Sequence, residues 1–205
     1  MIDEILVADA PAAWESAGFT VDPDGVCRVG SVRIRLVGEG DKRGILGWSL
    51  RAGVDGELDG VPTTRSGAGK PRPAAHANGV TSIDHVVLLS PDLDRTKVAL
   101  TSIGLEARRE RDGELAGASI RQVFYRLDDV ILEVVGSPDA AGDGPSSLWG
   151  ITFVTDDLDA SARFFGPNTS PVKDAIQPGR RITTLLHREL GMSVRTALIS
   201  PHVAS

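Results

Sequence analysis

One histidine and one glutamate stand in stretches of the sequence that are otherwise apolar. His85 lies in residues 83–89, which are rich in β-branched side chains, and Glu133 lies in residues 130–135. If both face one buried surface, each needs a polar partner, and the two could satisfy each other. Such a pair is also a candidate functional site, because burial beside a charge changes how readily a group binds protons. An imidazole with a carboxylate also suits a divalent ion such as Zn, Mn, Fe or Ni.

Four further side chains are candidates for contact with a ligand. Gln122 and Phe124 share one face of the strand that precedes Glu133, so Gln122 could line a pocket with Phe124 as its wall. The alternative is that both only cover the sheet. Arg180 lies in a turn, where its guanidinium could clamp a carboxylate or phosphate, although arginines in turns are usually solvated. Trp149 could form the floor of a pocket.

Residues 82–136 must position the histidine and the glutamate. A strand at 83–89 is followed by Ser90, which can cap a helix, and by proline in the first helical turn. Apolar residues then recur at helical spacing until Gly104, which predicts the end of the helix. Three strands are expected next, at 105–111, 118–127 and 130–135. The order is therefore β-α-β-β-β, and His85 meets Glu133 only if the first and last strands lie side by side.

The rest of the chain repeats parts of this pattern. Residues 2–7 match 83–88, Gly18 matches Gly104, and residues 28–38 match 126–136. The C-terminal piece begins a similar unit at Trp149 and ends its helix at Gly166, with strands expected at 181–187 and 193–199. Residues 44–50 resemble one more first strand. A unit of this size cannot bury its sheet alone, so two units must pair, and pairing curves the sheet around a cavity.

These repeats divide the chain into three parts. Residues 1–54 are expected to form a partial N-terminal module, and residues 55–81, rich in proline and glycine, a linker or covering arm. Residues 82–205 are expected to form one domain of two modules, at 82–136 and 147–205.

The β-α-β-β-β order, the Asp-His pair that opens the middle module and the Leu-Glu-Val-Val-Gly that closes it resemble the vicinal-oxygen-chelate superfamily. This group includes glyoxalase I, extradiol dioxygenases, epimerases, and bleomycin- or fosfomycin-resistance proteins. The resemblance is strongest over residues 82–199 and weaker over 1–50. It implies an α+β fold in which glyoxalase-like βαβββ modules form a curled mixed sheet with helices on the outside. The superfamily hosts many reactions, so the fold alone names none.

The resemblance also implies roles for the first pair of residues. Each module of the superfamily offers a metal ligand from its first strand and another from its last, and the matching positions are His85 and Glu133. The metal would bind two vicinal oxygens of a substrate and act as a Lewis acid, with Glu133 also a candidate catalytic residue.

Other modules depart from this pattern. The C-terminal module has Gly150 and Ala197 at the matching positions, and the N-terminal module has Glu4 and Arg35. Catalytic zinc sites generally keep three protein ligands, so a third would have to come from elsewhere. The candidates are His76, His187, His202 and Glu4 of the partner subunit.

Composition excludes several classes of function. The 205 residues carry a formal net charge of -6 and no block of Lys and Arg, which argues against binding to nucleic acid. Cys27 is the only cysteine, so no intrachain disulfide forms. No apolar run is long enough for a bilayer, and the acidic start is not a signal peptide, so we expect a cytoplasmic location. The N-terminal module lacks a complete partner, which favours a homodimer.

Two functional hypotheses remain open. The first is a metal-dependent lyase, isomerase or dioxygenase that uses His85 and Glu133 as ligands. The second is a binding protein of the drug-sequestering kind, in which the same cup holds a small molecule without chemistry. Gly150 and Ala197, which cannot bind a metal, favour the second.

Overall fold

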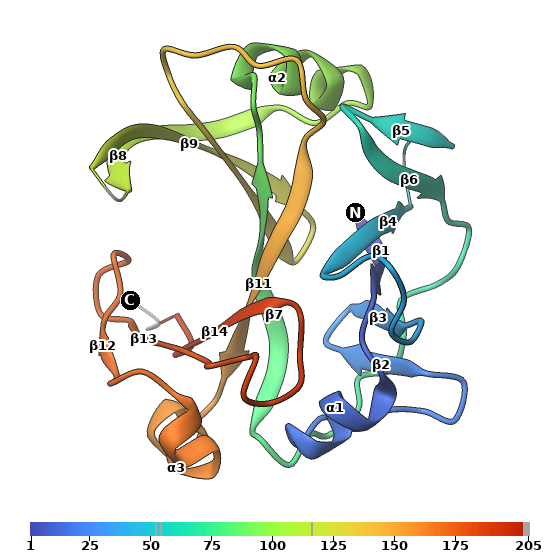
Figure 1. The fold of residues 1–205 in the computed structure, drawn as a ribbon, viewed down its shortest axis with the longest axis vertical. Coiled ribbons are helices and arrows are strands. Elements are labelled where there is room, and N and C mark those ends of the chain that lie inside the picture. Colours follow the sequence, from blue (N-terminus) through green and yellow to red (C-terminus); the bar gives the residue numbers. More distant parts are fainter. Residues whose placement is uncertain (52, 54, 116, 203–205) are drawn as a thin grey trace.

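A computed structural model describes residues 1–51, 53, 55–115 and 117–202, so residue 54, the expected end of the N-terminal piece, lies outside them. In this part the chain forms two β-sheets with short helices outside (Figure 1). The helices are α1 (Pro11–Ser16), α2 (Leu93–Ser102), α3 (Leu158–Phe165) and the 3-10 turn η1 (Gly166–Asn168). The N-terminal sheet contains β1 (Ile2–Val7), β2 (Val26–Val29), β3 (Val32–Leu36), β4 (Ile45–Leu50), β5 (Gly56–Leu58) and β6 (Val61–Arg65). The larger sheet contains β7 (Val80–Leu89), β8 (Ala107–Leu115), β9 (Ala118–Leu127), β10 (Val130–Gly136), β11 (Ser147–Thr155), β12 (Lys173–Asp174), β13 (Arg181–Thr184) and β14 (Arg195–Ile199).

Two βαβββ modules build the larger sheet. Its strand order is β12-β13-β14-β11-β7-β10-β9-β8, so in each module the last strand lies beside the first. The first strands, β7 and β11, pair antiparallel at the centre and join the modules. Figure 1 shows the sheet curled, with β8 and β9 on one side and β12 to β14 on the other. The predicted α+β fold of glyoxalase-like modules is confirmed.

Alternation along the central strands decides which side chains face the cup, by which we mean the concave face of the larger sheet. On β7, Val86 and Leu88 are fully buried, whereas His85 is only partly buried. On β10, Leu132 is buried in the same way and Glu133 is partly buried. Successive strand residues point to opposite faces, so the apolar set enters the core and the polar pair faces the cup.

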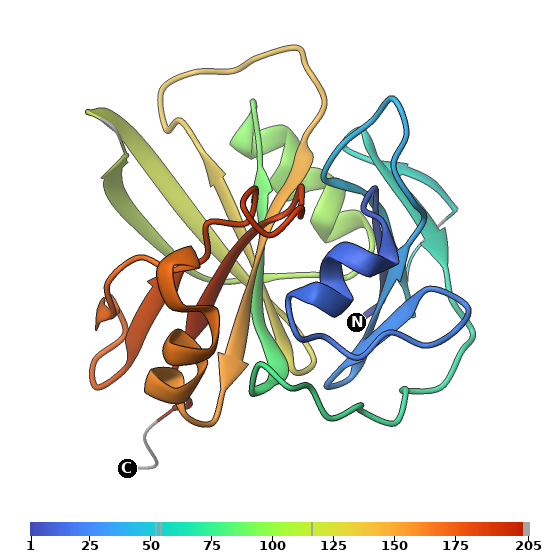
Figure 2. The same ribbon diagram turned by 60° about the horizontal axis from the view of Figure 1, so that its bottom comes forward.

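The N-terminal sheet covers the outer face of the larger one. Trp14 from α1 and Phe19 pack against Phe153 of β11, with ring centroids 6.3 and 5.3 Å apart, and all three side chains are buried. Figure 2 shows α1 and this sheet beside β7, on the side away from β8 and β9. The two sheets therefore share one hydrophobic core and leave the cup uncovered.

Two features of the N-terminal sheet differ from expectation. Residues 45–50 form β4, which pairs antiparallel with β1 as β11 does with β7, so the expected extra first strand is present. The reason given for a homodimer therefore falls away, because β1 finds its partner within the chain. Residues 56–65, expected within a linker, form the β5–β6 hairpin, whose turn residues Asp59 and Gly60 have φ of 50° and 83°. An Asp-Gly turn with two positive φ values is a hairpin connection.

Helix boundaries follow from local capping groups. Helix α2 is capped by Asp92, whose carboxylate accepts a hydrogen bond from the Arg95 amide, and not by Ser90 as expected. The Ser90 hydroxyl is instead bonded to that of Thr96. The predicted stop at Gly104 is present, with φ of 81°. None of the helices in the described residues has the length and hydropathy needed to cross a membrane.

Candidate functional site

The structure brings His85 and Glu133 together inside the cup. Strands β7 and β10 pair in parallel, with His85 opposite Ile131 and Glu133 two residues further along the same face. Nε2 of His85 lies 3.5 Å from Oε2 of Glu133. Their side chains are 14% and 13% exposed, so the pair is largely shielded but open to the cup.

Asp84 holds the other side of the imidazole. Its Oδ2 lies 2.8 Å from Nδ1 of His85, and its Oδ1 lies 2.7 Å from Nη1 of Arg180. Burial by itself raises the pKa of Asp84, but the bonds to His85 and Arg180 more than offset this, and its pKa lies below the usual value. Asp84 is therefore ionised, and the hydrogen of the imidazole resides on Nδ1.

Arg180 lies behind the imidazole and does not project towards a ligand as expected. Its side chain is 1% exposed, and Nε donates to the carbonyl of Ser200 at 2.8 Å. Because Nη1 already forms an ion pair with Asp84, Arg180 does not bind a substrate anion as expected. Nη2 makes no hydrogen bond to any described residue.

Gln122 and Phe124 stand on β9 beside Glu133. The Gln122 amide donates to Oε1 of Glu133, and its carbonyl accepts from Nε of Arg111 at 2.9 Å. Phe124 is the direct neighbour of Glu133 in the β9–β10 pairing. The guanidinium of Arg109 lies 5.5 Å from the centre of the Phe124 ring. Gln122 thus orients Glu133, a role that its position on the strand did not reveal.

The His85–Glu133 contact joins an imidazole nitrogen to a carboxylate. With the imidazole hydrogen on Nδ1, a neutral ring turns the lone pair of Nε2 towards Glu133. These are the two kinds of side chain that most often act as general acids and bases.

A cavity of ≈ 490 Å³ lies over the neighbouring strands of the larger sheet. It lies over β11, β14 and the segment after β13, and Thr152, which pairs directly with His85, forms part of its wall. Trp149, a predicted ligand contact, also lines it and is 41% exposed. The remaining lining residues are Val87, Gly150, Ile151, Thr184, Leu185, Leu186, His187, Arg188, Glu189, Arg195, Thr196 and Ala197. His85 and Glu133 do not line it themselves, and neither do Gln122, Phe124 and Arg180.

Arg195 was not among the site residues predicted from the sequence. Its guanidinium lies 4.8 Å from the centre of the Trp149 ring. The two meet because Gly150 pairs with Arg195 across β11 and β14, a register that no local pattern shows.

None of the expected third metal ligands on this chain forms a metal-binding group with His85 and Glu133 among the described residues. Nδ1 of His76 accepts a hydrogen bond from the Thr20 amide at 3.0 Å, beside Phe19 in the N-terminal part. Nε2 of His202 lies 3.3 Å from Nη1 of Arg180. His187 lines the cavity, and its pKa is lowered by burial and then by the charge of Arg195.

The residues present do not fit a resident catalytic metal ion. No group of three or more His, Cys, Asp or Glu side chains is placed to hold an ion within the described residues. At Gly150, the position of a missing ligand, a Cβ would lie 2.9 Å from the carbonyl oxygen of Arg195. His85 and Glu133 alone give two donors, one fewer than catalytic zinc sites generally keep.

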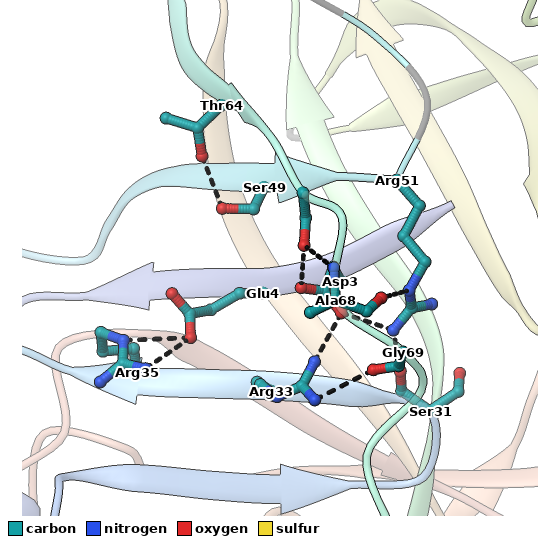
Figure 3. Close-up of polar contacts among 11 residues, drawn as sticks. Asp3, Glu4, Ser31, Arg33, Arg35, Ser49, Arg51, Thr64, Ala68 and Gly69 are labelled. Atoms are coloured by element: carbon teal, nitrogen blue, oxygen red, sulfur yellow. Dashed lines mark hydrogen bonds and ion pairs between the residues drawn. The ribbon is translucent and has the colours of Figure 1, made fainter. Parts of the chain in front are cut away.

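The matching positions of the N-terminal sheet hold an ion pair instead. Glu4 on β1 and Arg35 on β3 stand in the register of His85 and Glu133. Nε of Arg35 donates to Oε2 of Glu4 at 3.0 Å (Figure 3). Because a guanidinium has no lone pair to give, this pair binds no metal.

Polar side chains on this sheet hold the chain segment that follows β6. Oδ1 of Asp3 lies 2.6 Å from Nη1 of Arg33 and 2.5 Å from Nη2 of Arg51 (Figure 3). Both arginines also donate to backbone carbonyls of residues 68 and 69. Oδ2 of Asp3 accepts from Ser66 at 2.6 Å. This face of the N-terminal sheet therefore holds residues 66–69 in place. The candidate site lies in the larger sheet.

Comparisons with known proteins bear on the fold. No protein-family model matches the chain, and no curated protein matches it. A triple mutant of 4-hydroxymandelate synthase from Streptomyces coelicolor aligns with 100% of this chain and 92% of its own, at 15% identity and a TM-score of 0.64. A xylose isomerase-like TIM barrel/4-hydroxyphenylpyruvate dioxygenase fusion protein aligns with 100% of this chain and 49% of its own, at 13% identity and a TM-score of 0.61. Methylmalonyl-CoA epimerase from Mycobacterium tuberculosis aligns with 63% of this chain and 94% of its own, at 16% identity and a TM-score of 0.48.

At these identities the likeness establishes the fold and not the activity. Together with the paired βαβββ modules of the larger sheet, it shows that the chain has the fold of the vicinal-oxygen-chelate superfamily, which its sequence resembles.

Proposed function

We propose that the chain binds a small organic molecule in the cavity beside His85. The cavity volume of ≈ 490 Å³ lies within the range of about 300–1,000 Å³ that is usual for small-molecule sites. The observation that carries the proposal is the position of Thr152, which lines the cavity and is the direct neighbour of His85. A ligand there would contact the residue that pairs with His85, and we propose that it extends from there to the imidazole.

His85 and Glu133 suit a proton transfer to or from such a ligand. Asp84 fixes the imidazole on one side, and Gln122 fixes the carboxylate on the other. A general base must be held in position and lie near the proton that it removes. Lyase and isomerase reactions move a proton, so these are the reaction classes that the pair favours, with Glu133 as the candidate base. A ligand that is bound and never converted supports the sequestering alternative.

A second candidate is a divalent ion that the protein holds together with its ligand. His85 and Glu133, whose Nε2 and Oε2 lie 3.5 Å apart, would be the two protein donors, and such an ion would act as a Lewis acid towards the ligand. Asp84 on Nδ1 is the kind of partner that orients a metal-bound histidine. Two vicinal oxygens of the ligand would have to complete the coordination.

Thermal unfolding with a library of small molecules tests the first proposal. A compound that binds only the folded chain raises its stability, and Ala197→Phe, which fills the cavity, should abolish the shift. Each measurement is repeated with a chelator. Shifts that survive the chelator support binding without metal, and shifts that vanish support the second candidate. Shifts that persist in Ala197→Phe would place the ligand elsewhere and contradict both.

We also propose the homodimer and the cytoplasmic location, which remain predictions from the sequence, although the pairing of β4 with β1 removes one argument for the homodimer. Light scattering on the purified chain tests the first, and fractionation of cells tests the second.

A further inference from the structure

We infer that the ligand is a planar molecule with a negative charge, recognised by Trp149 and Arg195 together. This inference rests on the proposed function and names the class of molecule that the cavity takes.

Trp149 and Arg195 form one composite surface on the cavity wall. The guanidinium lies 4.8 Å from the centre of the indole ring, which orders a side chain that is otherwise flexible. Stacking uses the flat face of a guanidinium and leaves the N–H groups at its edge free to donate. No hydrogen bond or ion pair joins those groups to another side chain in the described part of the protein. An arginine that is ordered but has no carboxylate partner is prepared to bind one from a ligand.

The charge of the cavity wall differs from that of the whole chain. Arg188 and Arg195 line the cavity with one carboxylate, Glu189, although the chain has a formal net charge of -6. His187 adds no charge near neutral pH, because burial and the charge of Arg195 lower its pKa. A local excess of positive charge in an acidic protein attracts an anion to this place and repels it elsewhere.

Different residues of the cavity wall would therefore have different roles. Trp149 and Arg195 form the composite surface, whereas Thr152, also on β11, pairs with His85. The Glu133 carboxylate repels a second negative charge, so the anionic group of the ligand belongs at Arg195. The exposed part of Trp149 and the apolar side chain of Leu186, 47% exposed, provide flat and apolar contacts for the ring system.

This assignment differs from the one expected from the sequence. Arg180 was the expected anion clamp, but it is buried against Asp84. Arg195 takes that role because it is exposed and lines the cavity.

Two fluorescent dyes with the same ring system test the inference. The probes are 8-anilinonaphthalene-1-sulfonate, which is an anion, and N-phenyl-1-naphthylamine, which lacks the sulfonate. Their affinities are measured on the wild type, on Arg195→Gln and on Arg65→Gln, a control at an exposed arginine outside the cavity. We expect the anion to bind the wild type about tenfold more tightly than the neutral dye, as one charge-assisted contact allows. Arg195→Gln should abolish this preference, and Arg65→Gln should keep it.

The variant Ala197→Phe separates failure of the inference from failure of the proposed function. Loss of both dyes in this variant places them in the cavity. Equal affinities for the two dyes in the wild type, with both lost in Ala197→Phe, would overturn the inference and leave the proposed function standing. Absence of binding by either dye, or binding that Ala197→Phe does not affect, would count against the proposed function and against the inference with it.

Discussion

Nδ1 of His85 lies 2.8 Å from the carboxylate of Asp84, the residue that precedes it in the same strand. Neighbours in a strand normally point to opposite faces. Here the pairing of β7 with β11 shifts, so that His85 faces Thr152 and Ile83 faces Phe153, and Asp84 is the extra residue of a β-bulge. A bulge re-aims a side chain. It thereby supplies the imidazole with a fixed partner.

Replacing Asp84 should destabilise the chain strongly. Asp84→Asn leaves Arg180, whose side chain is 1% exposed, without its counter-charge. Breaking a buried pair in this way typically costs about 3–5 kcal/mol, which denaturant unfolding at neutral pH measures. Asp159→Asn is the matched control, because its ion pair with Arg181 is about half exposed and solvent screens such pairs, so little stability should be lost. Equal losses of stability in the two variants would contradict the assignment of Asp84 as the buried counter-charge of Arg180.

The carboxylate of Asp59 should make the free energy of unfolding depend on pH in the acid range. Its carboxylate lies 2.5 Å from Nε of Arg95, accepts from Ser146 at 2.6 Å, and also contacts Thr96. Burial alone raises its pKa, but these bonds more than offset burial, and the pKa lies below the usual value. A lowered pKa in the folded state gives stability that is present above the unfolded pKa of about 3.9 and is lost as pH falls through the folded pKa.

Asp59→Asn should therefore lower the free energy of unfolding at pH 7, and its difference from the wild type should narrow below about pH 4. Denaturant unfolding at a series of pH values measures both. Asp41→Asn, at an exposed carboxylate, is the control and should run parallel to the wild type. A difference between wild type and Asp59→Asn that stays constant with pH would show that the carboxylate does not act through its charge.

Metal binding should depend on which of the two missing ligand positions is restored. Ala197→Glu adds a carboxylate on β14, two residues beyond Arg195, in the register that Glu133 has on β10. Calorimetry should show that Zn²⁺ affinity rises by at least about tenfold, as for a site that gains a third ligand. Gly150→His should fail to do so and should lower stability, because its Cβ would lie 2.9 Å from the Arg195 carbonyl. A tight site in the unaltered chain would refute the two-donor assignment.

The fold could be predicted where its determinants are local. Alternating apolar residues on the middle strands and glycines at the ends of helices, such as Gly104, are visible in the sequence, and the strands and the helix stop were found where they were expected. The β5–β6 hairpin was missed because its strands are short and polar, and Pro62 lies within β6. Only the Asp-Gly turn at 59–60 marked it.

The candidate site was only partly predictable, because some of its contacts do not depend on local sequence. His85 and Glu133 stand at positions that the module pattern identifies, and the structure places them on one face. The role of Asp84 depends on a bulge, and the contact of Arg195 with Trp149 depends on the register between β11 and β14. Both arise from strand pairing between modules, which leaves no periodic signal in the sequence.

The titration of His187 should report the charge on the cavity wall. Burial is the main reason for its lowered pKa, and the positive charge of Arg195 adds to the effect. Arg195→Gln removes only the second cause, so the pKa of His187 should rise but remain below its usual value. NMR titration of the four histidines measures this shift, with His187→Gln to assign the signal and Arg65→Gln as a distant control. A bound anion at Arg195 should raise the same pKa in the wild type, since it neutralises the nearby charge. An unchanged pKa in both experiments would mean that Arg195 does not face His187 across the cavity.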